Sequence, residues 1–177
     1  PYTTLFRSRR DHDRHRENAC GECDSQGAGV VLGEAHEELA AFAEKYNLPV
    51  VSTLMGIGAF PNDHPLYMGF AGLHGRKSAN YTVAEADLVI AVGSRFGDRQ
   101  TGNIAKYVHD KHFIHIDIDP AEIDKNVHSS IGLSGDMKTI LNLLMQREAV
   151  NDLQQWWKIL KNRQDKYAYE YTGDYDV

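Results

Sequence analysis

Two short stretches carry charged side chains at a spacing that suits ligand binding. Arg95 and Arg99 flank Asp98 in one stretch, and residues 117–119 read Asp-Ile-Asp in the other. A guanidinium group binds phosphate or carboxylate through two parallel hydrogen bonds, so the arginines suit an anion; a solvated, salt-bridged loop would look the same. A carboxylate after a strand often binds a ribose or ribityl hydroxyl. Paired acids can instead hold a metal or cap a helix.

Glycine-rich segments form the second kind of candidate site. Residues 53–61 and 69–75 carry five glycines among apolar residues, and residues 27–29 add a Gly-Ala-Gly turn. Glycine lets a ligand approach the main chain closely, and successive backbone N–H groups can cradle a phosphate. Neither long segment matches the dinucleotide fingerprint or a Walker loop, so tight turns are an alternative interpretation.

These segments follow alternating strand and helix patterns. Apolar runs predict buried strands at 48–53 and 87–94. Residues 112–119, which alternate near their end, predict another strand, and residues 131–133 predict a weak last one. Three- and four-residue apolar spacings predict helices at 34–46, 78–86, 122–126, 137–147 and from about 152, with Asp136 as an N-cap. The order predicts an α/β fold with a doubly wound, mostly parallel Rossmann-like sheet and helices on both faces. The candidate loops should converge beyond the carboxyl ends of its strands.

Composition excludes several classes of protein. The chain has 177 residues and a net charge of −6, which argues against a nucleic-acid-binding face. No apolar run reaches membrane-spanning length, and no signal peptide is visible. Two neighbouring cysteines do not make a disulfide framework, so a reducing compartment is expected. We expect a cytoplasmic protein, or one of a plastid or mitochondrion if the source is eukaryotic, with no membrane or nucleic-acid partner.

Residues 1–26 differ from the rest of the chain. They lack hydrophobic periodicity, and residues 1–8 resemble the translation of a sequencing-library adapter, so we expect a disordered or artefactual segment. His12, His15, Cys20 and Cys23 have zinc-ligand character, but no apolar core flanks them.

No nucleophile–base pair stands out elsewhere. His74 lies among glycines, where a cofactor contact or a turn role is favoured over that of a base. His112 and His115 would face opposite sides of their strand, which argues against a shared metal. We therefore predict no catalytic residue and no metal ligand in this chain.

Four motifs together resemble the central domain of the acetolactate (acetohydroxyacid) synthase large subunit. They are Thr-Leu-Met-Gly-Ile-Gly-Ala-Phe-Pro at 53–61 with Asp-His-Pro at 63–65, Leu-His-Gly at 73–75 with Ala-Asn at 79–80, Gly-Ser-Arg-Phe-x-Asp-Arg-x-Thr-Gly at 93–102, and His-Ile-Asp-Ile-Asp-Pro-Ala-Glu-Ile at 115–123. The resemblance covers residues 27–146.

The resemblance implies a thiamine-diphosphate and magnesium enzyme that condenses pyruvate with a second 2-ketoacid, with release of CO2, in branched-chain amino acid biosynthesis. It also implies a homo-oligomer with a regulatory small subunit, and FAD as a bystander to the net chemistry, lying across this domain. Asp98 and Arg99 match the family's loop at the substrate entrance. The implied FAD contacts are Gly27, Ala28, Gly29, Thr53, Leu54, Met55, Leu73, His74, Gly75, Gly93, Ser94, Arg95, Asp98, Asp117, Ile118 and Asp136.

This sequence departs from the family pattern at three places. Gly97 stands where a second acid is usual, Leu73 stands where methionine is frequent, and residues 20–26 replace the first strand, which we expect to be missing. The family's thiamine-activating glutamate and its Gly-Asp-Gly motif belong to other domains. We expect residues 27–150 to be the FAD-binding domain and residues 151–177 a helix and linker towards an absent domain. The fragment should be inactive alone.

Two alternatives remain. The same fold in other thiamine enzymes binds ADP or nothing. A sirtuin-like NAD deacylase shares the sheet and the glycine elements, but its Asn–Asp motif and four-cysteine zinc module do not accompany them here.

Overall fold

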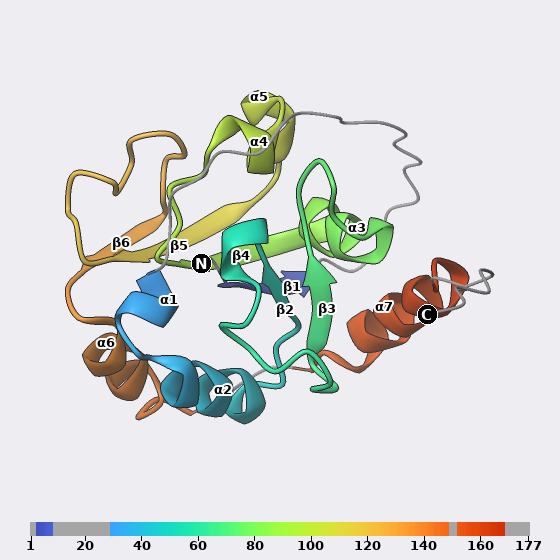
Figure 1. The fold of residues 1–177 in the computed structure, drawn as a ribbon, viewed down its shortest axis with the longest axis horizontal. Coiled ribbons are helices and arrows are strands. Elements are labelled where there is room, and N and C mark those ends of the chain that lie inside the picture. Colours follow the sequence, from blue (N-terminus) through green and yellow to red (C-terminus); the bar gives the residue numbers. More distant parts are fainter. Residues whose placement is uncertain (1–2, 9–28, 149–151, 169–177) are drawn as a thin grey trace, which may run out of the picture.

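The computed structural model describes residues 3–8, 29–148 and 152–168, and its strands form one open sheet in the order β3-β2-β1-β4-β5-β6 (Figure 1). The pairs β2–β3, β4–β5 and β5–β6 are parallel, whereas β1 is antiparallel to both of its neighbours. The predicted mostly parallel α/β sheet is confirmed. The strands are β1 (Thr3–Ser8), β2 (Val50–Ser52), β3 (Tyr67–Phe70), β4 (Ala86–Val92), β5 (His112–Asp117) and β6 (Ile131–Ser134).

Strand β1 occupies the centre of the sheet, although composition predicts no structured role for residues 1–26. Thr3 pairs with Ser52 and Val92, and Ser8 pairs with Ala86, so β1 runs against its neighbours. A gap between β2 and β4 would leave two rows of backbone N–H and C=O groups unpaired. The backbone of Thr3–Ser8, a segment that contains residues with strand propensity, pairs with both rows. β1 thereby joins the β2–β3 half of the sheet to the β4–β6 half. Residues 9–28 lie outside the described residues.

Helices lie on both sides of the sheet (Figure 1). Helices α2 and α6 pack against each other, and α3 packs against α7. In α2 the predicted apolar face is confirmed, because Leu39 and Phe42 are buried, and Asn47 follows the helix with a φ of 49°. The helical elements are α1 (Gly29–Leu32), α2 (His36–Lys45), η1 (Leu54–Gly56), α3 (Lys77–Glu85), α4 (Asp98–Thr101), α5 (Ile104–Tyr107), α6 (Met137–Leu144) and α7 (Gln154–Lys166).

Two local predictions are wrong. Residues 122–126 form turns rather than a helix. The Asp124 carboxylate there accepts hydrogen bonds from the Ser129 backbone N–H and hydroxyl, both at 2.6 Å. These bonds stabilise a turn, and a five-residue segment is too short to form a stable helix. Gly69 and Phe70 belong to β3 rather than to a loop. Gly69 has a φ of +102° there, and β2 pairs with β3 through a shifted register.

Helix α7 packs on this domain through its own apolar side chains. Trp156, Trp157 and Leu160 are buried, and the Trp157 indole N–H donates to the Asn47 carbonyl at 2.9 Å. The Arg163 guanidinium forms an ion pair with the Glu85 carboxylate of α3. The buried tryptophans of α7 therefore pack on the described part of the chain. In the described ranges, no helix is long and apolar enough to cross a membrane.

Candidate functional site at the carboxyl edge of the sheet

The loops after the parallel strands meet at one edge, as predicted. Because β1 is antiparallel to both β2 and β4, those two strands run the same way, and all five strands from β2 to β6 end at this edge. Backbone bonds tie the strand ends together. The Ala71 N–H donates to the Ser52 backbone carbonyl at 2.8 Å, and the Gly93 N–H donates to the Ile116 carbonyl at 2.7 Å. The Gly135 N–H donates to the Asp117 backbone carbonyl at 3.1 Å.

A close contact between two glycines brings α1 onto the end of β4. A Cβ atom added at Gly29 would lie 3.0 Å from the Gly93 Cα, and one added at Gly93 would lie 3.1 Å from the Gly29 Cα. The Met137 methyl group closes the same contact, at 2.7 and 2.6 Å from the two added atoms. Only glycine at both positions permits this approach, so the main chains of α1 and of the end of β4 pack directly on each other. The predicted contacts Gly27 and Ala28 lie outside the described residues.

The loop after β3 is held by the Asn80 side chain of α3. Its amide accepts from the Gly72 N–H at 2.9 Å and donates to the Gly72 carbonyl at 3.1 Å. A Cβ added at Gly72 would lie 3.3 Å from the Arg99 carbonyl, so this loop touches α4. The structure therefore brings the predicted Leu-His-Gly segment at 73–75 next to the helix that carries Asp98 and Arg99.

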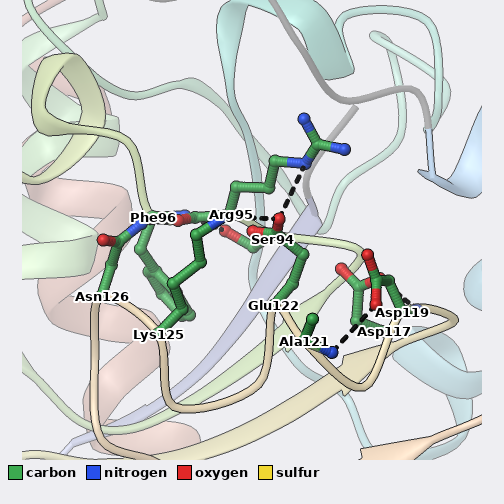
Figure 2. Close-up of polar contacts among 9 residues, drawn as sticks. All are labelled: Ser94, Arg95, Phe96, Asp117, Asp119, Ala121, Glu122, Lys125 and Asn126. Carbon is green, nitrogen blue, oxygen red and sulfur yellow. Dashed lines mark hydrogen bonds and ion pairs between the residues drawn. The ribbon is translucent and has the colours of Figure 1, made fainter.

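Arg95 extends from the end of β4 over the loop that follows β5 (Figure 2). Its Nε lies 3.8 Å from a Glu122 carboxylate oxygen, and Lys125 approaches the same oxygen at 2.8 Å. The Asn126 amide donates to the Arg95 carbonyl at 2.8 Å. The main chain and the side chain of Arg95 are thus both contacted by the loop at 118–130, while the neighbouring Ser94 is fully buried.

The three predicted aspartates at this edge have defined local roles. Asp117 is buried and accepts from the Asp119 N–H at 3.0 Å, and Asp119 accepts from the Ala121 N–H at 2.9 Å. Asp136 is confirmed as the N-cap of α6, accepting from the Thr139 N–H at 2.9 Å and its hydroxyl at 2.8 Å. These two bonds lower the pKa of the exposed Asp136 carboxyl, and the bond from the Thr139 N–H has the larger effect.

Apolar side chains complete the edge. Leu54 and Met55 in the loop after β2 are 43% and 46% exposed, and Ile118 after β5 is 69% exposed. Thr53, which directly follows β2, is buried. Large exposed apolar side chains beside polar strand ends fit a ligand with both a flat apolar part and charged groups.

His115 is the most deeply buried titratable group beside the site. It lies on β5 with no exposed surface, whereas His112 is exposed, so the prediction that they face opposite sides is confirmed. Neither ring nitrogen of His115 has a hydrogen-bond partner within the described part of the chain. Burial lowers its pKa, and the Ser94 backbone and nearby acids on the 117–124 segment oppose only part of that shift.

This lowered pKa predicts an acid-sensitive fold. Above about pH 7 the His115 ring is neutral in both states; as pH falls through its unfolded value of about 6.5, only the unfolded chain takes up the proton. The free energy of unfolding should therefore decrease between about pH 7 and the lowered folded pKa. Urea unfolding at several pH values, for wild type and His115→Gln, measures this. The stability difference between the two should change with pH; parallel curves would contradict the assignment. His112→Gln is the exposed comparison on the same strand.

No group of three or more His, Cys, Asp or Glu side chains that could hold a metal ion occurs among residues 3–8, 29–148 and 152–168. The His and Cys residues at 12, 15, 20 and 23 lie outside these ranges.

Residues 26–144 match the model of the thiamine pyrophosphate enzyme central domain. The chain therefore belongs to the thiamine pyrophosphate enzyme central-domain family.

The chain is similar to acetolactate synthases. The probable acetolactate synthase large subunit of Methanocaldococcus jannaschii is 52% identical over 119 residues, which cover 67% of this chain and 20% of the relative. The large subunit of Corynebacterium glutamicum is 41% identical over 150 residues (82% and 24%). The acetolactate synthase of Mycobacterium avium is 40% identical over 156 residues (85% and 25%). The chain thus spans between a fifth and a quarter of the length of these relatives.

Three residues at the site have roles that the motifs alone did not assign. Asn80 fixes the loop after β3, while Glu122 and Asn126 contact Arg95. Asn80 and Glu122 stand inside quoted motifs, so their presence is visible in the sequence. Asn80 contacts a residue eight positions away, and Glu122 contacts one twenty-seven positions away. No local sequence pattern reveals contacts at such separations. For Asn126 we find no sequence signal.

Proposed function

We propose that this chain is the central part of an acetolactate synthase large subunit and that its carboxyl edge binds FAD. The parent enzyme would condense pyruvate with a second 2-ketoacid and release CO2, in branched-chain amino acid biosynthesis. The observation that carries the proposal is the convergence at one edge of the Gly29–Gly93 contact, the Arg95 loop and the Asp117 strand end.

The described residues fit a flavin dinucleotide. The Gly29–Gly93 contact packs α1 directly on the end of β4, and successive backbone N–H groups at this edge would suit a diphosphate. Asp117 lies at a strand end, the usual position of a carboxylate that binds ribose or ribityl hydroxyls. The exposed side chains of Leu54, Met55 and Ile118 would contact the apolar rings. Bound FAD would supply a flavin that takes no part in the net condensation.

Asp98 and Arg99 would line the substrate entrance. They begin the short helix α4, and the loop at 71–76 touches the Arg99 carbonyl. A guanidinium at this place suits the carboxylate of a 2-ketoacid. Thiamine diphosphate and Mg²⁺ would be bound by parts of the parent outside the matched segment, and the 177-residue chain should form no acetolactate from pyruvate. The parent would act as a homo-oligomer with a regulatory small subunit in the cytoplasm or an organelle.

Titration of the purified chain with FAD, followed by flavin absorbance and fluorescence, tests the proposal. We expect saturable binding, with a shifted and structured flavin spectrum. Asp117→Asn should weaken FAD on the order of tenfold, because a charged acceptor is replaced by a neutral one. Asp165→Asn, on the exposed side of α7, is the matched control and should bind like wild type. An unshifted flavin spectrum at saturating FAD would sink the FAD assignment.

ADP distinguishes the alternative function. A central domain of another thiamine enzyme that binds ADP would bind this nucleotide with equal or higher affinity than FAD. If FAD binds more tightly than ADP, the apolar side chains of the edge contribute to the flavin part, as the synthase assignment requires.

A further inference from the structure

The Asn80 side chain of α3 makes two hydrogen bonds to one residue of the loop after β3. Its oxygen accepts from the Gly72 N–H at 2.9 Å, and its nitrogen donates to the Gly72 carbonyl at 3.1 Å. A side-chain amide offers a donor and an acceptor side by side, as a peptide group does. The two bonds therefore fix both the position and the orientation of the Gly72 backbone relative to α3.

Gly72 is the first residue of a tight turn that has Leu73 and His74 at its corner. The Gly75 N–H donates to the Gly72 carbonyl at 2.9 Å, which is the bond that closes a four-residue turn. His74 is exposed and Leu73 is half-buried, and the turn follows the carboxyl end of β3. Because Asn80 holds the first residue of this turn, it sets the place of both corner side chains.

The turn lies between two parts of the candidate site. On one side, the Ala71 N–H donates to the Ser52 carbonyl at the end of β2, which leads into the exposed apolar loop. On the other side, a Cβ atom added at Gly72 would lie 3.3 Å from the Arg99 carbonyl of α4. The corner of the turn is thus at the ligand edge, next to both the apolar loop and the charged helix.

We propose that Asn80 is a positioning residue that holds the Leu73–His74 turn in contact with bound FAD. This inference rests on the proposed ligand site. Gly72 has a φ of +120° and no side chain of its own, so glycine alone restricts this position weakly. A turn that Asn80 already holds loses less conformational entropy when the ligand binds than a free turn would, which raises affinity.

A purely structural role of Asn80 makes a different prediction. If its bonds only stabilised the fold, losing comparable bonds elsewhere would affect FAD binding equally. Tyr46 supplies the comparison, because its hydroxyl donates a bond shared between the Leu144 carbonyl at 2.6 Å and the Arg147 carbonyl at 2.9 Å. Helix α6 begins at the ligand edge with its Asp136 cap and ends near these carbonyls, so Tyr46→Phe removes contacts away from the site.

FAD titration and urea unfolding of the chain test the inference. Asn80→Asp keeps an acceptor for the Gly72 N–H but places a second oxygen against the Gly72 carbonyl. We expect FAD affinity to fall on the order of tenfold, since a hydrogen bond is replaced by repulsion between two oxygens. Tyr46→Phe should lower the urea midpoint but change FAD affinity by less than about twofold.

Asn103→Asp is the control for the same change of residue type. The Asn103 side chain accepts from the Lys106 N–H at 3.1 Å, at the start of α5, and aspartate keeps that role. This variant should bind FAD like wild type.

The corner residues show whether Asn80 acts through them. A chain with both Leu73→Ala and His74→Ala has lost the side chains that would touch FAD. In that background, Asn80→Asp should weaken FAD by less than about twofold further, because effects that act through the same contact are not additive.

Unchanged FAD binding by Asn80→Asp, an equal loss in Tyr46→Phe or Asn103→Asp, or an additive loss in the triple variant would overturn the inference. If Asn80→Asp does not fold, Asn80→Gln carries the test. Its longer side chain keeps both amide groups but displaces the turn, so FAD should bind more weakly, and wild-type affinity would overturn the inference. If wild type binds ADP but not FAD, the FAD assignment fails and the same comparison with ADP decides the role of Asn80. Binding of neither overturns both.

Discussion

Gly93→Ala is expected to lower the free energy of unfolding by about 3 kcal/mol and to weaken FAD binding at least about tenfold. The new methyl group would lie 2.6 Å from the Met137 methyl and 3.1 Å from the Gly29 Cα. Met137 can turn aside, but the Gly29 backbone can move only with α1. Gly93 also has a φ of +64°, which costs alanine about 1 kcal/mol by itself. Urea unfolding and FAD titration measure the two effects.

Two other glycines serve as controls for Gly93. Gly97 follows four residues later in the same loop, with an ordinary φ of −59° and open space around an added Cβ. Gly97→Ala should therefore match wild type. Gly102 has a φ of +57° and also open space, so Gly102→Ala reports the backbone cost without the collision. If Gly93→Ala were no more destabilising than Gly102→Ala, the close approach of α1 and β4 would not be essential.

Phe96→Ala should destabilise the chain by about 3–5 kcal/mol, because its ring is the centre of a buried aromatic cluster. Phe96 is 2% exposed, and its ring centroid lies 5.1 Å from that of His115, 5.7 Å from that of Phe113 and 6.2 Å from that of Tyr107. Its φ of 49° is uncommon for a bulky residue. Alanine would keep that backbone strain and lose the packing that compensates it.

The effect of Phe96→Ala should extend to the proposed substrate entrance. Phe96 directly precedes the segment that carries Asp98 and Arg99, so loss of its ring should loosen α4. Thermal or urea unfolding gives the change in stability, and limited proteolysis after Arg99 reports local opening. Ile104→Ala, which removes a 40% exposed side chain from neighbouring α5, is the control and should cost less than about 1 kcal/mol. Equal destabilisation by both variants would contradict the central role of the ring.

Local patterns predicted the regular elements where one chemical signal dominated. The apolar run at 87–94 predicted β4, because a strand buried on both faces needs continuous apolar residues. Asp136 was predicted as the N-cap of α6 because an aspartate just before an apolar helix can accept from the N–H three residues later, as it does from Thr139. Strand β3 was missed, because its four residues contain a glycine with positive φ and show no alternation.

The candidate site shows the same division. The motifs at 53–61, 93–102 and 115–123 are contiguous in sequence, so their resemblance to acetolactate synthase was readable directly. The family-model match then placed residues 26–144 in the thiamine pyrophosphate enzyme central-domain family. The individual FAD and substrate-entrance assignments remain predictions, and the Asp117 and Gly93 variants would test those for FAD.

By itself, the sequence determined the α/β class, the parallel order of most strands and the residue types at the carboxyl edge, because these depend on local periodicity and strand–helix alternation. Only the tertiary structure decided that Thr3–Ser8 fills the central position of the sheet, that Gly29 meets Gly93, and that Glu122 reaches Arg95. Each of these contacts joins residues twenty-seven or more positions apart. Such contacts form only when the whole sheet assembles, since unpaired backbone groups and buried charges are satisfied by whichever segments the fold brings near.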